Sequence, residues 1–553
     1  MPKTDQLVVP ADAPETFPEW IRTVCGRLGE KTVLDVCGAT RTAAELDYRT
    51  DCYSAGLSTL GLQVGDHVAV MMLNSVENIE IWFGIQKAGL VEVPVHTASR
   101  GDLLQYLLGH GDVKALVIDE SLVARIENIL ESLPQLQHLV VNSESVPTKY
   151  ADHVTSHRLS DLCLDSPPPR LELSTQSTAV ILHTSGTTGP PKGVVLSHGA
   201  VLHLTRHLVW LMDYGPTDRL YTTFPLFHNN AKYTSVTAAL ECGGSLVMDR
   251  KFSASGFWST CREKDVTAFN YMGAMLMMLH KQTPSENDLI NPVRTAFGAP
   301  CPVHIWEDFE ARFGLSLVEV YGMTESPMAC ETRLEQRKIG TAGQESTTYQ
   351  VMIADDDDRP VAPDVPGEIL IRPKSPNAIF SSYYKKEQET VEAWKNLWFH
   401  TGDQGSMDAE GFLTFIDRKK DCIRRRGENI SSWEVESAVN SSDQVVESAA
   451  YGVDSDLSEA EVMVAVVARD RATFDPLELI DHCHGRMSDH AVPRYVRQVD
   501  ELPKNHAQRV EKYRLREDGL TPDIWGPPGR RGIEMKQMRS PNRYSIDRST
   551  KEM

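Results

Sequence analysis

The chain has 553 residues, of which 41% are hydrophobic and 24% charged, which is enough apolar material for several packed domains. Its formal net charge of −21 argues against a nucleic-acid partner and against electrostatic binding to anionic lipid. The ten cysteines stand singly, no apolar run is long enough to span a membrane, and the N-terminus lacks the pattern of a secretory signal, so a cytoplasmic protein with reduced thiols is expected.

Short apolar strands alternate with amphipathic helices over most of the chain. This alternation is typical of an α/β fold. A helix is predicted over 76–90, and strands are predicted over 67–75, 113–121, 177–185 and 244–252. Around 367–373 and 411–417 the pattern becomes strand-rich with Gly and Pro, which predicts a small β subdomain.

Composition and pattern divide the chain into three parts. Residues 1–417 form the large domain, and residues 418–520 are predicted to form a smaller α/β domain with a helix near 432–440 and strands near 445–453 and 462–470. Residues 521–553 are rich in Pro, Gly, Ser and Arg, which predicts a disordered tail.

The most informative segment is TSGTTGPPKG, residues 184–193, which follows a predicted buried strand. Its glycines let backbone N–H groups approach phosphate oxygens, its hydroxyls add donors, and Lys192 adds a positive charge. It is not a Walker loop, because Gly193 stands where that motif has Ser or Thr, and the following VVLS is typical of a strand rather than a helix. The density of such groups indicates a phosphate-binding loop rather than a surface turn.

Further segments follow this loop in a fixed order. They are PLFHNN (225–230), FGAPCP (297–302), YGMTE (321–325), TGD (401–403), DRKKD (417–421) and RRGENIS (425–431). Together these segments resemble the adenylate-forming superfamily of acyl-CoA synthetases, peptide-synthetase adenylation domains and luciferases, over about residues 20 to 520. GENISSWEVE (427–436) is most similar to the carnitine/crotonobetaine-CoA ligase-like group. The resemblance implies a large N-terminal AMP-binding domain with several subdomains and a small mobile C-terminal domain.

The resemblance also implies an ATP site. Glu325 would be the magnesium ligand, Thr324 would bond the α-phosphate, and Lys192 would bind phosphate. Asp403 would accept the ribose hydroxyls, for which its two carboxylate oxygens are suited, and Arg418 would contact the ribose from the other side. The other residues implied to bind ATP are Thr184, Ser185, Gly186, Thr187, Thr188, Gly189, Gly298, Ala299, Pro300, Tyr321 and Gly322.

Other segments are implied to bind the acid and coenzyme A. The acid pocket would include His228, Asn229, Asn230 and Lys232, and this polar character favours a small or polar acid over a long fatty chain. Lys420 would be the hinge of the small domain, and Gly427 and Glu428 would line the tunnel for coenzyme A. For the run Arg424–Arg426, a solvated face is favoured over contact with the phosphates of coenzyme A.

One position departs from the family. Its members carry a Gly-Lys pair near the C-terminus, and the lysine enters the active site during adenylation. Here Gln508 and Arg509 replace that pair. Arg509 keeps the charge, although a planar guanidinium is not equivalent to an ammonium, and Lys504 or Lys512 could serve instead.

These features predict an ATP-dependent, AMP-forming ligase that adenylates a small or polar carboxylic acid, releases pyrophosphate and passes the acyl group to coenzyme A. ATP, magnesium and coenzyme A are the implied ligands. An alternative is an adenylating enzyme with another acceptor, either a nitrite-activating diazotase or an enzyme that loads a carrier protein. A non-enzymatic nucleotide-binding regulator is a third possibility, against which Lys192, Glu325 and Asp403 argue. No GxSxG motif is present to anchor a hydrolase triad.

Overall fold

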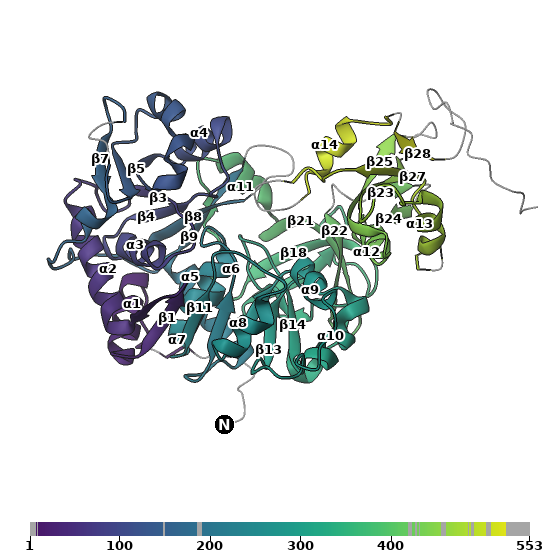
Figure 1. Ribbon diagram of the computed structural model, residues 1–553, viewed down its shortest axis with the longest axis horizontal. Helices are drawn as coiled ribbons and strands as arrows, with labels where there is room; N and C mark the ends of the chain where they lie inside the picture. Colours follow the sequence, from purple (N-terminus) through teal and green to yellow (C-terminus); the bar gives the residue numbers. More distant parts are fainter. Residues whose placement is uncertain are drawn as a thin grey trace, which may run out of the picture. The chain divides into compact units, whose positions relative to one another are not determined.

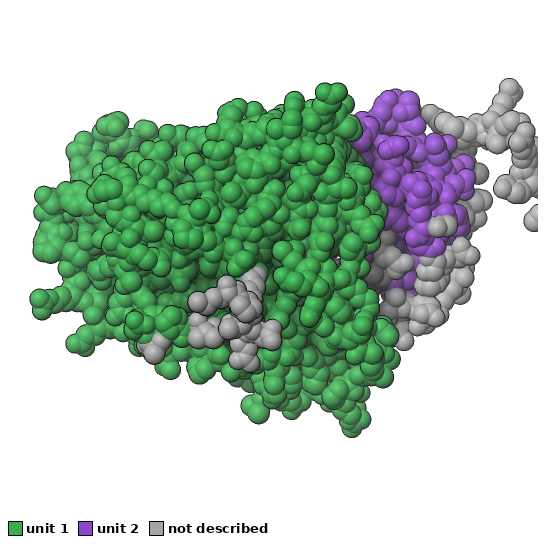
Figure 2. Space-filling model, turned by 90° about the horizontal axis from the view of Figure 1, so that it is seen from below, with its two compact units in different colours: residues 1–420, 504–509 green, residues 421–503, 510–553 purple. Residues whose placement is uncertain are grey.

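The computed structural model divides the chain into two compact units, residues 1–420 with 504–509 and residues 421–503 with 510–553 (Figures 1 and 2). The structure describes residues 7, 9–10, 12–146, 150–184, 191–418, 423–425, 428–430, 432–454, 460–484, 486–487, 491–504, 510–521 and 523–526. The predicted α/β fold, with a large N-terminal and a small C-terminal domain, is confirmed. The predicted boundaries 1–417 and 418–520 stay predictions, and most of the predicted tail, residues 521–553, lies outside the described residues.

One sheet of the large unit carries the predicted phosphate loop (Figure 1). The strands from β7 to β8 run parallel, and the last two at the other edge run antiparallel to their neighbours. In spatial order the strands are β7 (Thr155–Arg158), β6 (His138–Asn142), β5 (Val113–Asp119), β3 (His67–Met71), β4 (Val91–Pro94), β8 (Thr178–Thr184), β9 (Lys192–Ser197) and β19 (Ser382–Tyr383).

The same unit contains a second sheet. The strands from β14 to β1 run parallel, so the predicted motifs that follow β13 and β14 lie at one edge, where parallel sheets bind their ligands. In spatial order the strands are β16 (Gln344–Glu345), β15 (Cys330–Glu331), β14 (Ser316–Tyr321), β13 (Thr295–Gly298), β12 (Ala268–Tyr271), β10 (Arg219–Thr222), β11 (Ser245–Met248), β1 (Thr32–Val36) and β2 (Ala39–Thr42).

Four helices share one buried cluster with strands of both sheets and therefore lie between them: α1 (Phe17–Leu28), α3 (Val76–Lys87), α5 (His198–Met212) and α7 (Thr237–Glu241). Local sequence sets their starts. Pro18 stands in the first turn of α1, and the Ser75 and Ser197 hydroxyls cap α3 and α5. The other helices of this unit outside the site are α2 (Ala43–Ser58), α4 (Gly101–His110), η1 (Glu120–Arg125), η2 (Glu127–Ser132), η3 (Leu159–Leu162), α8 (Phe257–Glu263), α9 (Gly273–His280), η5 (Val303–Ile305), α10 (Trp306–Phe313), η6 (Leu334–Gln336) and α11 (Glu387–Ala393).

The strand-rich region completes the large unit as an antiparallel sheet. Its strands are β17 (Tyr349–Ala354), β18 (Gly367–Pro373), β21 (Trp398–Met407), β20 (Trp394–Lys395) and β22 (Leu413–Arg418). The predicted strands near 367–373 and 411–417 are therefore present. Within the described part of the chain, no helix is both long and apolar enough to cross a membrane.

The small unit has its own sheet and core. Its helices pack on a sheet in which β27 runs parallel to β26 and the other pairs are antiparallel. Its elements are β23 (Ile423–Arg425), β24 (Glu428–Ile430), α12 (Ser432–Asn440), β25 (Val445–Asp454), β26 (Ala460–Ala468), α13 (Pro476–Cys483), β27 (Tyr495–Val499), α14 (Lys512–Glu517) and β28 (Ile524–Trp525).

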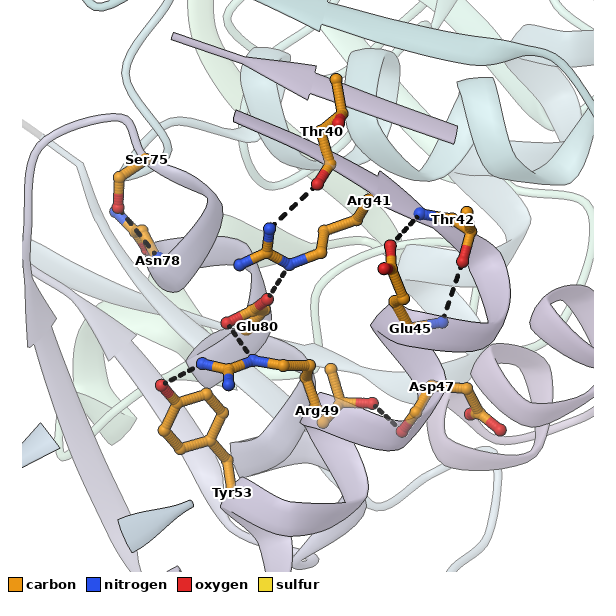
Figure 3. A network of polar contacts seen from close by, with 11 residues as sticks. Thr40, Arg41, Thr42, Glu45, Asp47, Arg49, Tyr53, Ser75, Asn78 and Glu80 are labelled. Atoms are coloured by element: carbon orange, nitrogen blue, oxygen red, sulfur yellow. Dashed lines mark hydrogen bonds and ion pairs between the residues drawn. The ribbon is translucent and has the colours of Figure 1, made fainter. Parts of the chain in front are cut away.

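A buried carboxylate ties the N-terminal helices together (Figure 3). Glu80 of α3 is fully buried, and its two oxygens lie 2.7 Å from Arg41 Nε and 3.1 Å from Arg49 Nε. Arg49 also donates to the Tyr53 hydroxyl, at 3.2 Å. The network joins β2, α2 and α3, and it compensates a charge that would be costly to bury alone.

We expect the large unit to lose stability as the pH falls from about 6.5 to about 4. Burial lowers the pKa of His183, His198 and His203 to about 4, so all three stay neutral in the folded unit while they take up protons in the unfolded chain below pH 6.5. The unfolded state then binds more protons, and each histidine lowers the free energy of unfolding by at most about 1.4 kcal/mol per pH unit.

Urea unfolding followed from pH 7 to pH 4.5 measures this dependence. His183 is the best test position because both ring nitrogens are buried without a hydrogen-bond partner among the described residues. His183→Asn is expected to reduce the pH slope by about one proton. An unchanged slope would contradict the assignment.

Candidate active site

The predicted phosphate loop joins two neighbouring antiparallel strands. β8 ends at Thr184 and β9 begins at Lys192, and these two residues pair across the ladder. The Tyr106 hydroxyl donates to the Pro191 carbonyl at 3.1 Å, so a helix side chain also holds one end of the loop. Of the predicted loop residues, Ser185, Gly186, Thr187, Thr188 and Gly189 lie outside the described residues.

The side chains of Lys192 and Glu325 meet at Tyr383. The Lys192 ammonium lies 4.5 Å from the centroid of the Tyr383 ring, and the Tyr383 hydroxyl donates to Glu325 Oε1 at 2.9 Å. Glu325 is 8% exposed, and Thr324 precedes it in the turn after β14. Sequence reasoning missed Tyr383, which carries no motif of its own and lies on an edge strand.

Burial raises the pKa of the Glu325 carboxyl. The hydrogen bond from the Tyr383 hydroxyl and the positive charges of Arg418 and Lys192 partly offset this increase. A buried carboxylate in this setting is suited to a cation. The described residues hold no cluster of three or more His, Cys, Asp or Glu side chains that could bind a metal ion. Magnesium commonly binds one or two carboxylates and takes its other ligands from phosphates and water, so the chemistry of the Glu325 carboxylate fits this ion.

Asp403, Arg418 and Tyr321 form a second polar cluster. Asp403 on β21 pairs with Arg418 on β22, and Arg418 Nε lies 3.3 Å from Asp403 Oδ1. The Tyr321 hydroxyl, at the end of β14, donates to Asp403 Oδ2 at 2.9 Å. Asp403 is 5% exposed. The structure therefore brings together three residues that the sequence places up to 97 positions apart, since they are numbered 321, 403 and 418.

The predicted adenine-flanking segment follows β13. A Cβ atom at Gly298 would lie 2.1 Å from the Tyr271 carbonyl oxygen, so only glycine fits there. The peptide bond between the next two residues, Ala299 and Pro300, is cis. Gly322 is as closely packed, because a Cβ atom there would lie 2.4 Å from the Met328 nitrogen.

Glu319 is a further ionisable residue at this edge that sequence reasoning missed. It pairs with Gly298 across β13 and β14, and its carboxyl accepts the Cys301 amide at 2.9 Å. Burial raises its pKa to about 8. The sequence signal that could have identified Glu319 was a single acidic residue within the otherwise apolar strand LVEVY.

The predicted acid-binding segment follows β10. The rings of His228 and Phe227 lie 4.6 Å apart, and residues 229–231 form the short helix α6 (Asn229–Ala231). Asn230 Oδ1 accepts from the Asn270 amide at 2.8 Å. Asn229 Oδ1 is buried and has no hydrogen-bond partner among the described residues.

Lys232 follows at once and begins the π-helical turn η4 (Lys232–Val236). Its ammonium lies 2.6 Å from Glu92 Oε1 and 3.7 Å from the centroid of the Trp82 ring, and both charged side chains are fully buried. Burial lowers the pKa of Lys232 to about 8. The charge of Lys232 is therefore engaged by Glu92.

Three of the residues predicted for the hinge, the coenzyme A tunnel and adenylation lie outside the described residues: Lys420, Gly427 and Arg509. The fourth, Glu428, begins β24.

The run Arg424–Arg426 was predicted to be solvated, and for Arg425 this is wrong. Its side chain is 11% exposed, and its Nε lies 2.7 Å from Glu461, which also pairs with Arg494. The reason is the buried Glu461 carboxylate on β26, which needs positive partners.

Comparison with known proteins agrees with this geometry. Residues 21–384 match the AMP-binding enzyme family, and residues 434–509 match the AMP-binding enzyme C-terminal domain. The crotonobetaine/carnitine–CoA ligase of Escherichia coli strain Crooks is 30% identical over 469 residues, 83% of this chain and 89% of that protein. The corresponding ligase of Salmonella agona is 28% identical over 468 residues, with the same coverage.

Solved structures share the fold. The anthranilate CoA ligase AuaEII in complex with anthranoyl-AMP superposes with a TM-score of 0.84 at 21% identity, covering 92% of this chain and 99% of that chain. A benzoate CoA ligase from Burkholderia xenovorans LB400 superposes with a TM-score of 0.79 at 22% identity, covering 91% and 99%. The resemblance seen in the sequence motifs is confirmed, and the chain belongs to the AMP-binding enzyme family.

Proposed function

We propose that this chain is an ATP-dependent acid–CoA ligase that adenylates a small or polar carboxylic acid and transfers the acyl group to coenzyme A. The observation that carries the proposal is the buried Glu325 carboxyl, which accepts the Tyr383 hydroxyl at 2.9 Å while the Lys192 ammonium lies over the same tyrosine ring. Such a group of charges suits the α-phosphate of ATP, where positioning and charge neutralisation supply most of the catalysis. The curated relatives named above are CoA ligases.

In the first half-reaction, the acid carboxylate attacks the α-phosphorus and pyrophosphate leaves. Lys192 and Thr324 bind the phosphates, and Glu325 would hold magnesium. The metal, when bound, neutralises charge on the phosphate oxygens. Gly186 and Gly189, with Thr184, Ser185, Thr187 and Thr188, supply the remaining donors of the loop.

The nucleoside is held by residues of the second sheet and of the antiparallel sheet. Asp403 accepts the ribose hydroxyls, and the bonds from Tyr321 and Arg418 fix its orientation. Gly298, Ala299 and Pro300 form one wall for the adenine, together with the neighbouring Gly322. At both glycines a Cβ atom would collide with neighbouring backbone, so the chain can take this path only with glycine there.

The acid occupies the space beside His228, Asn229 and Asn230. The polar side chains of these residues support a small polar substrate. In the second half-reaction, Gly427 and Glu428 line the path of coenzyme A. The cytoplasmic location expected from the composition stays a prediction.

An acid panel scored for AMP formation, with and without coenzyme A, tests the proposal. The panel includes carnitine, crotonobetaine, benzoate, anthranilate, malonate, a long-chain fatty acid and nitrite. We expect one small or polar acid to give AMP and an acyl thioester only when coenzyme A is present. The alternative acceptors are not favoured, because the relatives named above are CoA ligases. AMP formation best supported by nitrite, with no effect of coenzyme A, would overturn the proposal.

Lys420→Pro is expected to slow acyl transfer to coenzyme A much more than adenylate formation. The proposed hinge must change its backbone dihedral angles between the two half-reactions, and proline fixes φ and restricts the preceding residue. Single-turnover assays measure each half-reaction separately. Lys420→Ala is the matched control, since it removes the same side chain but leaves the backbone free, and equal losses in both half-reactions of the proline variant would contradict a hinge at this position.

A further inference from the structure

A fully buried ion pair includes Lys232, which comes two residues after the proposed acid-binding residues 228–230. Glu92 on β4 and Lys232 on η4 are both 0% exposed, and Trp82 of α3 covers the ammonium. Glu92 Oε2 is buried without a hydrogen-bond partner among the described residues, so the pair leaves one oxygen uncompensated. Removing two charges from water costs more than their attraction commonly returns, and an apolar pair of similar volume is often at least as stable. Stability alone therefore gives little reason for this pair.

The pair anchors an unusual turn of helix. Lys232 starts the π-helical residues 232–236, and its backbone N–H donates to the His228 carbonyl at 3.2 Å. Such π-helical turns are rare and often occur at functional sites. The side chain of Lys232 thus joins the end of the acid-binding segment to strand β4, which lies 140 residues earlier in the sequence.

The same turn is hydrogen-bonded to Asn230 and Asn270. The Asn230 carbonyl accepts the Thr234 hydroxyl at 2.6 Å and the Ser235 hydroxyl at 3.1 Å. The buried Asn270 amide donates to Asn230 Oδ1, Thr234 Oγ1 and Ser235 Oγ, all within 2.9 Å. A displacement of η4 would therefore move Asn230, and with it the neighbouring Asn229 and His228.

We propose that Glu92 and Lys232 are positioning residues that determine acid specificity. They do not touch the acid; they fix the turn that presents His228, Asn229 and Asn230 to it. This inference rests on the proposed acid-binding role of residues 228–230. It assigns to Lys232 a place behind the pocket wall, where Glu92 neutralises its charge.

The decisive variant replaces the pair by apolar side chains, Glu92→Leu with Lys232→Met. It removes both charges together, so no buried charge is left alone, and the methionine keeps contact with Trp82. Lys264→Met with Asp35→Leu is the control. This ion pair of the same unit also joins a strand to the end of a helix, at 2.6 Å, but its lysine is 40% exposed. Three quantities are compared: the melting temperature, KM and kcat across the acid panel, and KM for ATP.

We expect the double variant to melt near the wild-type temperature and to show an increase in KM for the best acid of about tenfold or more, with a changed rank order of acids. KM for ATP should stay within about twofold, and the control pair should leave the acid profile unchanged. A double variant with wild-type acid KM and rank order would overturn the inference, because the pair would then be merely structural.

Two further measurements keep the outcome decisive. Hydrogen exchange of residues 228–236 should become faster in the double variant, and unchanged exchange there would overturn the inference even if no acid in the panel is a substrate. A wild-type protein without acid-dependent AMP formation would instead overturn the proposed function. If the double variant does not fold, Glu92→Asp tests the inference instead, because it keeps the negative charge but has a side chain one carbon shorter. This variant should raise KM for the acid without changing KM for ATP.

Discussion

Glu325→Gln is expected to lower the rate of adenylate formation by about 100-fold or more, the scale of losing one charged group that stabilises the transition state. The substitution removes the charge while it keeps the shape of the side chain, and the Tyr383 hydroxyl can still donate to the amide oxygen. The protein should therefore fold normally. Acid-dependent exchange of labelled pyrophosphate into ATP measures the loss, and a melting curve checks the fold.

Tyr383→Phe is the matched control for this prediction. It removes the hydrogen bond to Glu325 Oε1 at 2.9 Å but keeps the ring beneath Lys192. We expect a smaller loss, of about tenfold, because a single hydrogen bond to the carboxylate is worth less than the charge of the carboxylate itself. If Glu325→Gln retained activity within about threefold of wild type, Glu325 would have no part in the mechanism.

Arg509→Ala is expected to lower adenylation by about 100-fold, while acyl transfer from a preformed adenylate stays nearly unchanged. In the family, a lysine at this place neutralises charge on the α-phosphate and then turns away with the small domain. A guanidinium is always ionised and is less strongly hydrated than an ammonium, so it can serve in a closing cleft. Arg509→Lys should retain part of the activity.

Lys504→Ala and Lys512→Ala are the matched controls for Arg509. The structure describes both lysines, and Lys512 is already engaged within the small unit, where its ammonium lies 2.8 Å from Glu436 Oε1 and also bonds the Ser432 hydroxyl. We therefore expect Lys512→Ala to reduce stability more than adenylation. Normal adenylation by Arg509→Ala, with loss in one of the two lysine variants, would transfer the role to that lysine.

Much of the fold could be predicted because hydrophobic periodicity reflects burial. The predicted strands near 67–75, 113–121, 177–185 and 244–252 correspond to β3, β5, β8 and β11, and the helix over 76–90 corresponds to α3. The change to a β subdomain was also predicted correctly. In these segments local pattern and tertiary packing agree, and such agreement is typical of natural sequences.

The site was predicted less completely, because its partners come from distant segments. Tyr383 reaches Glu325 across 58 residues, and Glu92 reaches Lys232 across 140. Neither Tyr383 nor Glu92 stands in a motif, so no local pattern could identify them. Arg425 was misjudged for the same reason, since the buried Glu461 that binds it lies on another strand.

The connection between β8 and β9 limits which insertions and deletions the chain can tolerate during evolution. Val194 and Leu196 belong to one buried cluster and Val195 to the other, so β9 presents alternate residues to two different cores. Because side chains alternate along a strand, a slip of one residue would exchange these faces. Substitutions within the connection leave that register intact, whereas an insertion or deletion must be absorbed between Thr184 and Lys192 or it will misplace the whole strand. The register of β9 therefore constrains the length of this segment, in addition to the constraint that phosphate binding places on its composition.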